Sequence, residues 1–405
     1  MTQSKYRILV NDFSGHPFQV QLSRWLAAQG HAVLHTYCSS FQTPHGSLTL
    51  RSSDPSSLGI EPFATDRPFR KYDLYSRWKQ EVELGKKVIK KAEEFKPDIV
   101  LSANMPLGAQ RLLCNWSAKG SCRFIFWLQD VFGYGIRTVL KSRLWWPGEM
   151  IGRVFEQLEK RMWRNSDHII TISDDFTQVV SQAGVPSDKI TTIPNWAPLD
   201  ELPVKNRNNP WRQKHQLDDK CCILYSGTLG FKHNPQLLVQ LAESFRDNEE
   251  VRIVVNSEGK GADFLRHQKD QKNLDNLLLL GFQPFEDMPD VLATGDILVT
   301  LLEMEAGKFA VPSKVLSYLC ARRALLMAVP ETNLSARIVE SVNAGLVVSP
   351  DDGDGFVEAA HRLVDSITLR KELADNGRAY ANETFDIESI GKNFERAFEL
   401  AMEKS

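Results

Sequence analysis

The chain has 405 residues, too many for one ordinary hydrophobic core, and this length favours two domains. Its 49 basic and 51 acidic residues leave a net charge of −2, which argues against nucleic acid as the main partner because phosphate binding needs a basic excess. Six scattered cysteines show no zinc or disulfide spacing. No apolar run approaches the ~20 residues of a membrane helix, and no signal segment opens the chain. We therefore expect a cytosolic protein.

Short apolar runs alternate with amphipathic stretches through the first half, a pattern typical of parallel α/β units. The apolar runs predict strands at residues 6–10, 32–36, 98–102, 123–128 and 168–172. The amphipathic stretches predict helices at residues 17–29, 76–95 and 149–165.

Two loops that follow these strands carry candidate site residues. Gly15 and His16 come after the first strand, where an ordinary strand–helix turn is an equally open interpretation. Asp130 follows the strand at 123–128. A carboxylate there suits the orientation or deprotonation of an acceptor hydroxyl, whereas a purely structural Asp130 would cap the next segment.

The segment from Arg137 to Arg164 interleaves basic side chains with tryptophans and other large apolar residues. This composition suits the headgroup region of an anionic membrane leaflet. Three glutamates dilute the charge, so a packed amphipathic helix is the alternative.

Residues 200–212 are polar, contain two prolines and predict a linker, after which the α/β pattern restarts. The second half predicts strands at residues 222–226, 251–255, 277–280 and 296–302. It predicts helices at residues 235–245 and 387–404. Two Rossmann-like halves joined by one linker are therefore the expected architecture.

Glycine or a small polar residue follows several strands of the second half, where exposed amides suit phosphate oxygens. The dinucleotide, Walker, H-E-x-x-H and G-x-S-x-G signatures are all absent. Lys232 follows the first of these loops and could stabilise the charge of a leaving diphosphate, with His233 and Asn234 beside it to share the task. A solvated lysine at a helix start is the alternative for Lys232.

The segment from Glu303 to Cys320 predicts an anion cradle. A polar loop containing Gly307 and Lys308 leads to Ser313, a predicted N-cap, and Lys314 opens an apolar helical run. The open amides and both lysines would attract a phosphate at the carboxyl edge of the sheet. A surface turn with incidental lysines is the alternative.

Four motifs, in their order and spacing, make the chain resemble glycosyltransferase family four, of the GT-B fold, over essentially its whole length. They are Ile193-Pro194-Asn195-Trp196-Ala197-Pro198, Leu224-Tyr225-Ser226-Gly227-Thr228-Leu229-Gly230, Leu280-Gly281-Phe282, and Val311-Pro312-Ser313-Lys314 through Leu319. The chain is most similar to the bacterial branch that assembles colanic acid and O-antigens.

The resemblance implies two facing Rossmann-like domains, with an acceptor-binding domain at 1–203, a nucleotide-sugar-binding domain at 204–384, and a helix at 385–405 that returns to the first domain. It implies a hexosyl or N-acetylhexosaminyl transfer with retained configuration, without a metal or cofactor, from a donor that is UDP-linked. The implied acceptor is a polyprenyl-linked saccharide, which places the protein at the inner face of the cytoplasmic membrane, in surface polysaccharide or lipopolysaccharide assembly.

The loops and the resemblance together give a predicted site. The predicted catalytic residues are His16, Asp130 and Lys232. The predicted donor-binding residues are Gly15, Ser226, Gly227, Thr228, Lys232, Glu258, Gly281, Phe282, Gly307, Lys308, Pro312, Ser313, Lys314 and Ser317.

The chain departs from the family at two glutamates that normally lie eight positions apart. The ribose position is Ser317, and the sugar-side position falls near Phe309. Glu303 or Glu305 could replace the sugar-side group. The loss of the pair keeps open a non-catalytic GT-B subunit that binds a nucleotide-sugar or a partner enzyme, and, less strongly, a sugar-nucleotide epimerase.

Overall fold

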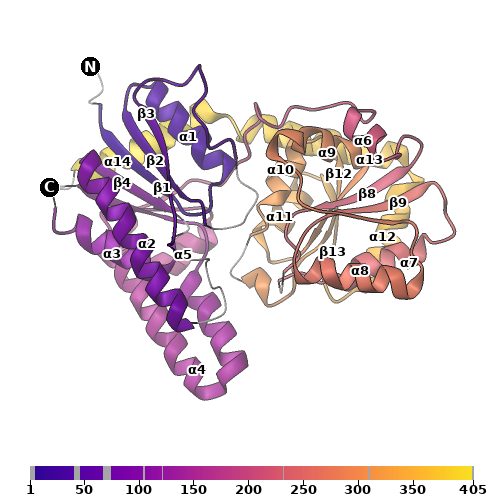
Figure 1. The fold of residues 1–405 in the computed structure, drawn as a ribbon, viewed down its shortest axis with the longest axis horizontal. Helices are drawn as coiled ribbons and strands as arrows, with labels where there is room; N and C mark the ends of the chain where they lie inside the picture. Colours follow the sequence, from indigo (N-terminus) through magenta and orange to yellow (C-terminus); the bar gives the residue numbers. More distant parts are fainter. Residues whose placement is uncertain are drawn as a thin grey trace. The chain divides into compact units, whose positions relative to one another are not determined.

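The computed structural model describes residues 5–40, 46–66, 74–103, 105–120, 122–230, 232–308 and 311–403. The chain folds into two compact units, and each contains one parallel sheet flanked by helices (Figure 1). Unit 1 comprises residues 1–195 and 387–405, and unit 2 comprises residues 196–386. Unit 2 thus begins eight residues before the boundary placed at 204 from the sequence.

The sheet of unit 1 has seven parallel strands in the order β3-β2-β1-β4-β5-β6-β7. Its strands are β1 Arg7–Asp12, β2 Ala32–Cys38, β3 Leu58–Phe63, β4 Ile99–Ala103, β5 Arg123–Leu128, β6 His168–Thr171 and β7 Ile190–Thr192. Its helices before the linker are α1 Pro17–Ala28, α2 Leu74–Phe95, α3 Leu107–Ser117, α4 Phe132–Asn165 and α5 Asp174–Gln182, with the short η1 Ser187–Lys189 after them. No described helix is both long and apolar enough to cross a bilayer.

The last helix, α14 (Ile387–Glu403), packs on unit 1 although nearly 200 residues separate it from the rest of that unit (Figure 1). Phe394 meets Trp127 of β5 edge to face at 4.8 Å between ring centroids. Glu395 lies 3.0 Å from His31. Gly391 lies against Trp25 of α1, where an added Cβ would come within 2.3 Å of the indole ring. An edge-to-face aromatic contact, a buried polar pair and a close glycine contact therefore fix this helix.

We expect Gly391→Ala to lower the free energy of unfolding by about 1–3 kcal/mol, because the new methyl group would overlap the Trp25 ring in a packed interface. Urea denaturation measures the change. The neighbouring exposed Lys392→Ala is the matched control and should change stability by less than ~0.5 kcal/mol. Equal stability of wild type and Gly391→Ala would show that α14 does not pack on α1 in this way.

The sheet of unit 2 has six parallel strands in the order β10-β9-β8-β11-β12-β13. Its strands are β8 Cys221–Ser226, β9 Val251–Asn256, β10 Leu277–Leu280, β11 Ile297–Leu301, β12 Ala324–Ala328 and β13 Gly345–Val348. Its helices are α6 Pro210–Lys214, α7 Gln236–Ser244, α8 Lys260–Lys272, α9 Met288–Thr294, α10 Lys314–Cys320, α11 Leu334–Ser341, α12 Gly353–Asp365 and α13 Ile367–Thr384, with the short η2 Phe285–Asp287 and η3 Ala306–Lys308.

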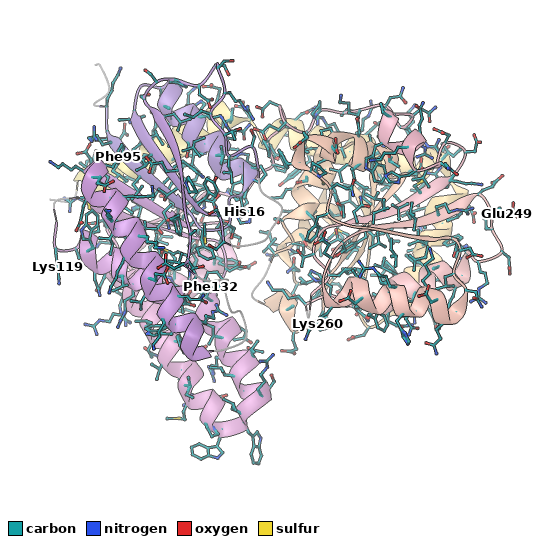
Figure 2. The ribbon with its side chains drawn as sticks, in the orientation of Figure 1. His16, Phe95, Lys119, Phe132, Glu249 and Lys260 are labelled. Atoms are coloured by element: carbon teal, nitrogen blue, oxygen red, sulfur yellow. The ribbon has the colours of Figure 1, made fainter. Side chains whose placement is uncertain are left out.

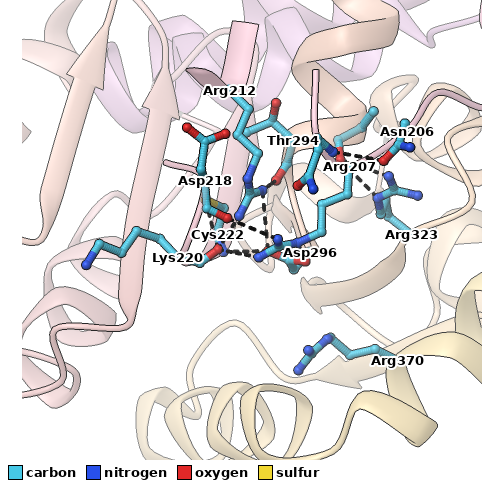
Figure 3. Close-up of polar contacts among 12 residues, drawn as sticks. Asn206, Arg207, Arg212, Asp218, Lys220, Cys222, Thr294, Asp296, Arg323 and Arg370 are labelled. Atoms are coloured by element: carbon cyan, nitrogen blue, oxygen red, sulfur yellow. Dashed lines mark hydrogen bonds and ion pairs between the residues drawn. The ribbon is translucent and has the colours of Figure 1, made fainter. Parts of the chain in front are cut away.

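The prediction of a linker at 200–212 was wrong in its second part. Arg212 of α6 is fully buried and donates a 2.6 Å hydrogen bond to the carbonyl of Thr294 (Figure 3). Arg207 forms an ion pair with Asp296, 2.6 Å from Nε to Oδ1, and the same carboxylate accepts a 2.9 Å bond from the Cys222 amide. This polar cluster ties residues 207–212 to the amino ends of β8 and β11, so these residues belong to the folded unit.

Candidate functional site in unit 2

The strand order of unit 2 creates a switch point between β8 and β11. The chain proceeds outward from β8 through β9 to β10, then returns to the other side of β8 and proceeds outward from β11. The loops that follow β8 and β11 therefore leave the sheet side by side, the position where open α/β sheets bind ligands. A 2.8 Å hydrogen bond from the Glu303 amide to the Lys232 carbonyl joins the two loops.

Tyr318 of α10 holds the end of β8. Its hydroxyl accepts a 3.0 Å bond from the Ser226 amide and donates a 3.1 Å bond to the Ser226 carbonyl. The next residue, Gly227, has φ +130°, which disfavours any side chain, and an added Cβ would lie 3.0 Å from the ammonium of Lys314. The predicted glycine loop is therefore closed by a lysine from a distant helix.

The ammonium group of Lys314 is buried without a hydrogen-bond partner among the described residues. It lies 3.6 Å from the centroid of the Tyr225 ring and beside Gly227. Burial lowers the pKa of Lys314 from 10.5 to about 7. A buried cation that contacts an aromatic ring and has no hydrogen-bond partner among the described residues lowers the stability of the fold. This arrangement indicates a site that an anion completes.

The predicted capping role of Ser313 was wrong. Ser313 has helical backbone angles (φ −58°, ψ −26°), and its side chain makes no capping hydrogen bond. A capping serine typically has an extended backbone, which turns its hydroxyl towards the amides of the first turn. Since α10 also has only seven residues, the positive charge at this edge comes from Lys314 rather than from a capped helix start.

Lys232 and His233 behave differently from each other. Lys232 is exposed at the end of the loop after β8. His233 accepts a 3.0 Å hydrogen bond from the Gly230 amide at Nδ1, and its pKa falls to about 3 because of burial and the charges of Lys314 and Lys232. His233 is therefore neutral in this structure and its Nδ1 supports the turn at Gly230.

The remaining predicted donor residues occupy neighbouring loops of the same edge. Thr228 accepts a 2.8 Å bond from the Tyr225 hydroxyl at its carbonyl. Exposed Glu258, after β9, accepts a 3.2 Å bond from the Phe282 amide, beside Gly281 after β10. The carbonyl of Gly307 accepts a 3.0 Å bond from the side chain of Asn333.

The other predicted residues lie around η3 and α10, and some of their atoms fall outside the described residues. Pro312 precedes α10, and Ser317 lies half-buried on it, one turn after Lys314. Lys308 ends η3, but its side chain lies outside the described residues, as do all atoms of Phe309. Of the two glutamates proposed as substitutes, Glu303 is partly buried, which raises its pKa together with the charge of Asp351, and Glu305 is exposed.

In unit 1 the predicted residues also lie at the carboxyl edge of the sheet. Gly15, with φ +71°, and His16 follow β1, and Asp130 follows β5, with β4 between these two strands (Figure 2 labels His16). The fully buried Asp12 organises the first loop by accepting bonds from the amides of Ser14 at 3.1 Å and His16 at 2.5 Å. Its carboxylate also lies 3.5 Å from the His16 ring nitrogen.

A buried glutamate holds the segment after Asp130. Glu159 of α4 accepts bonds from the amides of Phe132 at 3.1 Å and Gly133 at 2.8 Å. Burial raises the pKa of Glu159 to about 8, and the charge of Asp130 adds to the effect. Glu159 thus fixes the start of α4, two residues after Asp130.

Several of these supporting residues were not predicted from the sequence. Asp12 had a usable signal, since it ends a buried strand directly before a glycine loop. Tyr225, Tyr318 and Glu159 gave none, because each looks like a core residue or a helix-surface charge until the fold places it.

Asn256, at the end of β9, is buried, and its side-chain amide makes no hydrogen bond with a described residue. No group of three His, Cys, Asp or Glu side chains suited to a metal occurs among the described residues.

Comparison with known proteins agrees with this architecture. Residues 18–201 match the family model for Glycosyltransferase Family 4, and residues 207–380 match the model for Glycosyl transferases group 1. The chain is 24% identical over 309 residues to the putative colanic acid biosynthesis glycosyl transferase WcaI of Escherichia coli, over 74% of this chain and 73% of that protein. It is 21% identical over 238 residues to the alpha-D-kanosaminyltransferase of Streptomyces kanamyceticus, over 58% of this chain and 60% of that protein.

Solved structures show the fold. HepE of Anabaena in complex with UDP-glucose has a TM-score of 0.69 at 15% identity, over 97% of this chain and 99% of that one. Sucrose-phosphate synthase of Thermosynechococcus elongatus has a TM-score of 0.73 at 14% identity, over 99% of this chain and 100% of that one. With two Rossmann-like domains and both family models matched in order, the chain belongs to glycosyltransferase family four and has the GT-B fold.

Proposed function

We propose that this glycosyltransferase moves a hexosyl or N-acetylhexosaminyl group from a UDP-linked donor to a lipid-carrier-linked saccharide during the assembly of a bacterial surface polysaccharide. The observation that carries the donor half is the buried ammonium of Lys314 at the switch point of unit 2, which has no hydrogen-bond partner among the described residues. The named relatives support the class of reaction. One is named for colanic acid biosynthesis, and the HepE structure contains UDP-glucose.

Glycosyl transfer requires positive charge at the position where the diphosphate leaves. The bond between the sugar C1 and the phosphate oxygen breaks, and the acceptor oxygen bonds to C1 on the same face. The acceptor proton passes to the departing phosphate. Lys314 and Lys232 would stabilise the negative charge that grows on this leaving group, so no divalent cation and no cofactor are required by the proposal.

The acceptor half of the proposal uses unit 1. Asp130 would orient the attacking hydroxyl, and His16, steadied by Asp12, would hydrogen-bond the acceptor. A lipid-linked acceptor would place the reaction at the inner face of the cytoplasmic membrane. In unit 2, Glu303 would contact the donor sugar in place of the missing family glutamate, because it is partly buried and its amide donates to the carbonyl of Lys232 in the loop after β8.

Nucleoside diphosphates test the donor half directly. A ligand present at ~100 times its dissociation constant should stabilise the protein by roughly 2.7 kcal/mol, visible as a rise in Tm. We expect UDP to do so more than GDP, dTDP or ADP. The same donors are then incubated with lipid-linked acceptors and the products detected, which also separates transfer from epimerisation. No Tm shift with any of the four at millimolar concentration would contradict a nucleotide-sugar function.

A further inference from the structure

Helix α4 is a hairpin of two antiparallel arms rather than one helix, and the arms extend away from the sheet of unit 1 (Figure 1). The break falls at Trp145, which has φ 53° and ψ −129°, and Pro147 follows it. Such angles are strained for a residue with a side chain, and strain of this kind is kept where a position has a task. At the base, Phe155 meets Trp78 of α2 edge to face at 6.1 Å.

The two arms meet through glycines. An added Cβ on Gly148 would lie 2.0 Å from the Leu140 carbonyl oxygen, and one on Gly152 would lie 2.5 Å from the Cα of Arg137. Gly133 makes the same kind of close approach to Glu156. The arms are therefore too close for large apolar side chains to pack between them at these levels.

Ion pairs complete the contact between the arms. Arg137 reaches Glu149, with 3.0 Å from Nε to Oε1, and Glu156 at 3.2 Å. Lys141 lies 3.2 Å from Glu149, and the pKa of Glu149 falls to about 2 because Arg137 and then Lys141 bond to it. The hairpin is thus held by small residues and charges on its inside.

Large apolar side chains point to solvent instead. Of the 13 large hydrophobic side chains that are exposed among the described residues, eight belong to α4. The most exposed of these eight are Trp145 at 81%, Trp146 at 70% and Val154 at 67%. Leu144, Met150 and Ile151 are exposed beside them. A helical hairpin with ion pairs between its arms and tryptophans facing solvent is the reverse of ordinary packing, and such a patch marks an interaction surface.

The charge of the hairpin selects the partner. Residues 132–165 contain seven basic and three acidic side chains, a balance of +4 in a chain whose net charge is −2. Lys141 and Arg153 are more than half exposed near the turn, and Arg143 is exposed beside Leu144. Tryptophans with basic residues suit the headgroup layer of an anionic bilayer.

We propose that the tip of the α4 hairpin, residues 139–154, docks the protein on anionic membranes by inserting Trp145 and Trp146 at the headgroup level. The three consecutive exposed residues Leu144, Trp145 and Trp146 surround a turn, which suits entry into a fluid layer better than contact with one flat protein face. The purpose of this docking, access to a lipid-linked acceptor, rests on the proposed function, but the docking itself does not.

Vesicle co-sedimentation tests the proposal with the full-length protein. The vesicles are phosphatidylcholine alone or phosphatidylcholine with one-third phosphatidylglycerol, at 50 mM and 500 mM salt. We expect wild type to bind the anionic vesicles at 50 mM salt and to lose most of that binding at 500 mM. Trp145→Ala/Trp146→Ala should bind at least 10-fold more weakly, and Arg143→Glu about 10-fold more weakly.

The matched control is Ile367→Ser, which removes another exposed apolar side chain, 72% exposed, from unit 2. It should bind vesicles like wild type, and all variants should keep the wild-type Tm. Failure of wild type to bind anionic vesicles, or equal binding by the tryptophan variant, would overturn the proposal. Self-association that disappears in that variant would also overturn it, in favour of a second copy as the partner.

The two proposals fail separately. Vesicle binding needs no nucleotide, and the Tm shift with UDP needs no vesicle. A protein that binds vesicles but no nucleotide keeps the docking surface and loses the proposed function, and the converse result keeps transfer to an acceptor that is soluble or delivered by a partner.

Discussion

Replacement of Lys314 by methionine should lower turnover by ~10²-fold or more and at the same time make the protein more stable. Methionine fills a similar volume over the Tyr225 ring but brings no buried charge to the site. Under the proposed function, the leaving diphosphate would then lose one of its two cations. Steady-state transfer assays measure the first effect, and urea denaturation should show a gain on the order of 2 kcal/mol at pH 7.

The stability gain has a defined pH dependence. The pKa of Lys314 falls from 10.5 to about 7 on folding, so between these values the unfolded chain holds a proton that the folded chain has released. Folding of wild type is therefore penalised most below pH 7, and the penalty disappears as the pH rises towards 10.5. The difference between Lys314→Met and wild type should be largest at pH 6 and close to zero at pH 10.

Lys232→Ala is the comparison that separates the two effects. Lys232 is exposed, so its removal should reduce turnover by a similar factor without a gain in stability. If Lys314→Met keeps wild-type turnover, the diphosphate does not bind at the β8–β11 switch point. If Lys314→Met loses turnover and stability together, the ammonium has a structural role.

Asp130→Asn should lower turnover by about 10²-fold with little change in nucleotide affinity, because Asp130 lies in unit 1 and would act on the acceptor hydroxyl. Asparagine preserves the shape but carries no negative charge and so orients a hydroxyl more weakly. Turnover at saturating donor and the dissociation constant of UDP are measured for the same preparation.

Asp174→Asn is the matched control, since Asp174 also follows a strand of the unit 1 sheet and is exposed in the first turn of α5. It should keep nearly full turnover. A collapse of UDP binding in Asp130→Asn would instead assign that aspartate to the donor, and unchanged turnover would remove it from the chemistry.

Apolar runs predicted most central strands because buried parallel strands are apolar on both faces. β3 was not predicted because it contains Glu61 and Pro62, which an edge strand tolerates. β7 was not predicted because it has only three residues. β12 was hidden because its apolar residues nearly continue those of α10, with only Arg322 and Arg323 as a polar break. The second arm of α4 was predicted, and Pro147 and Gly148 mark a turn before it, but no local pattern showed that the two arms pack against each other.

The predicted site residues came from loop chemistry, and their partners could not be predicted in the same way. The contact between Lys314 and Tyr225 joins residues 89 positions apart, and it depends on the order of β8 and β11 in the sheet. The helix-start argument for Ser313 failed because it assumed an extended backbone before α10. Local patterns thus located the edge of the sheet, and tertiary packing decided which group supplies its charge.

Proton uptake on UDP binding tests the central claim most directly. At pH 8 the Lys314 side chain is mostly neutral in the protein without UDP, because its pKa is about 7. A bound diphosphate should raise that pKa again. Calorimetric titration with UDP at pH 8, in buffers of different ionisation enthalpy, should therefore show the uptake of close to one proton in wild type and almost none in Lys314→Met. Equal proton uptake in the two proteins would contradict the placement of the donor diphosphate at Lys314.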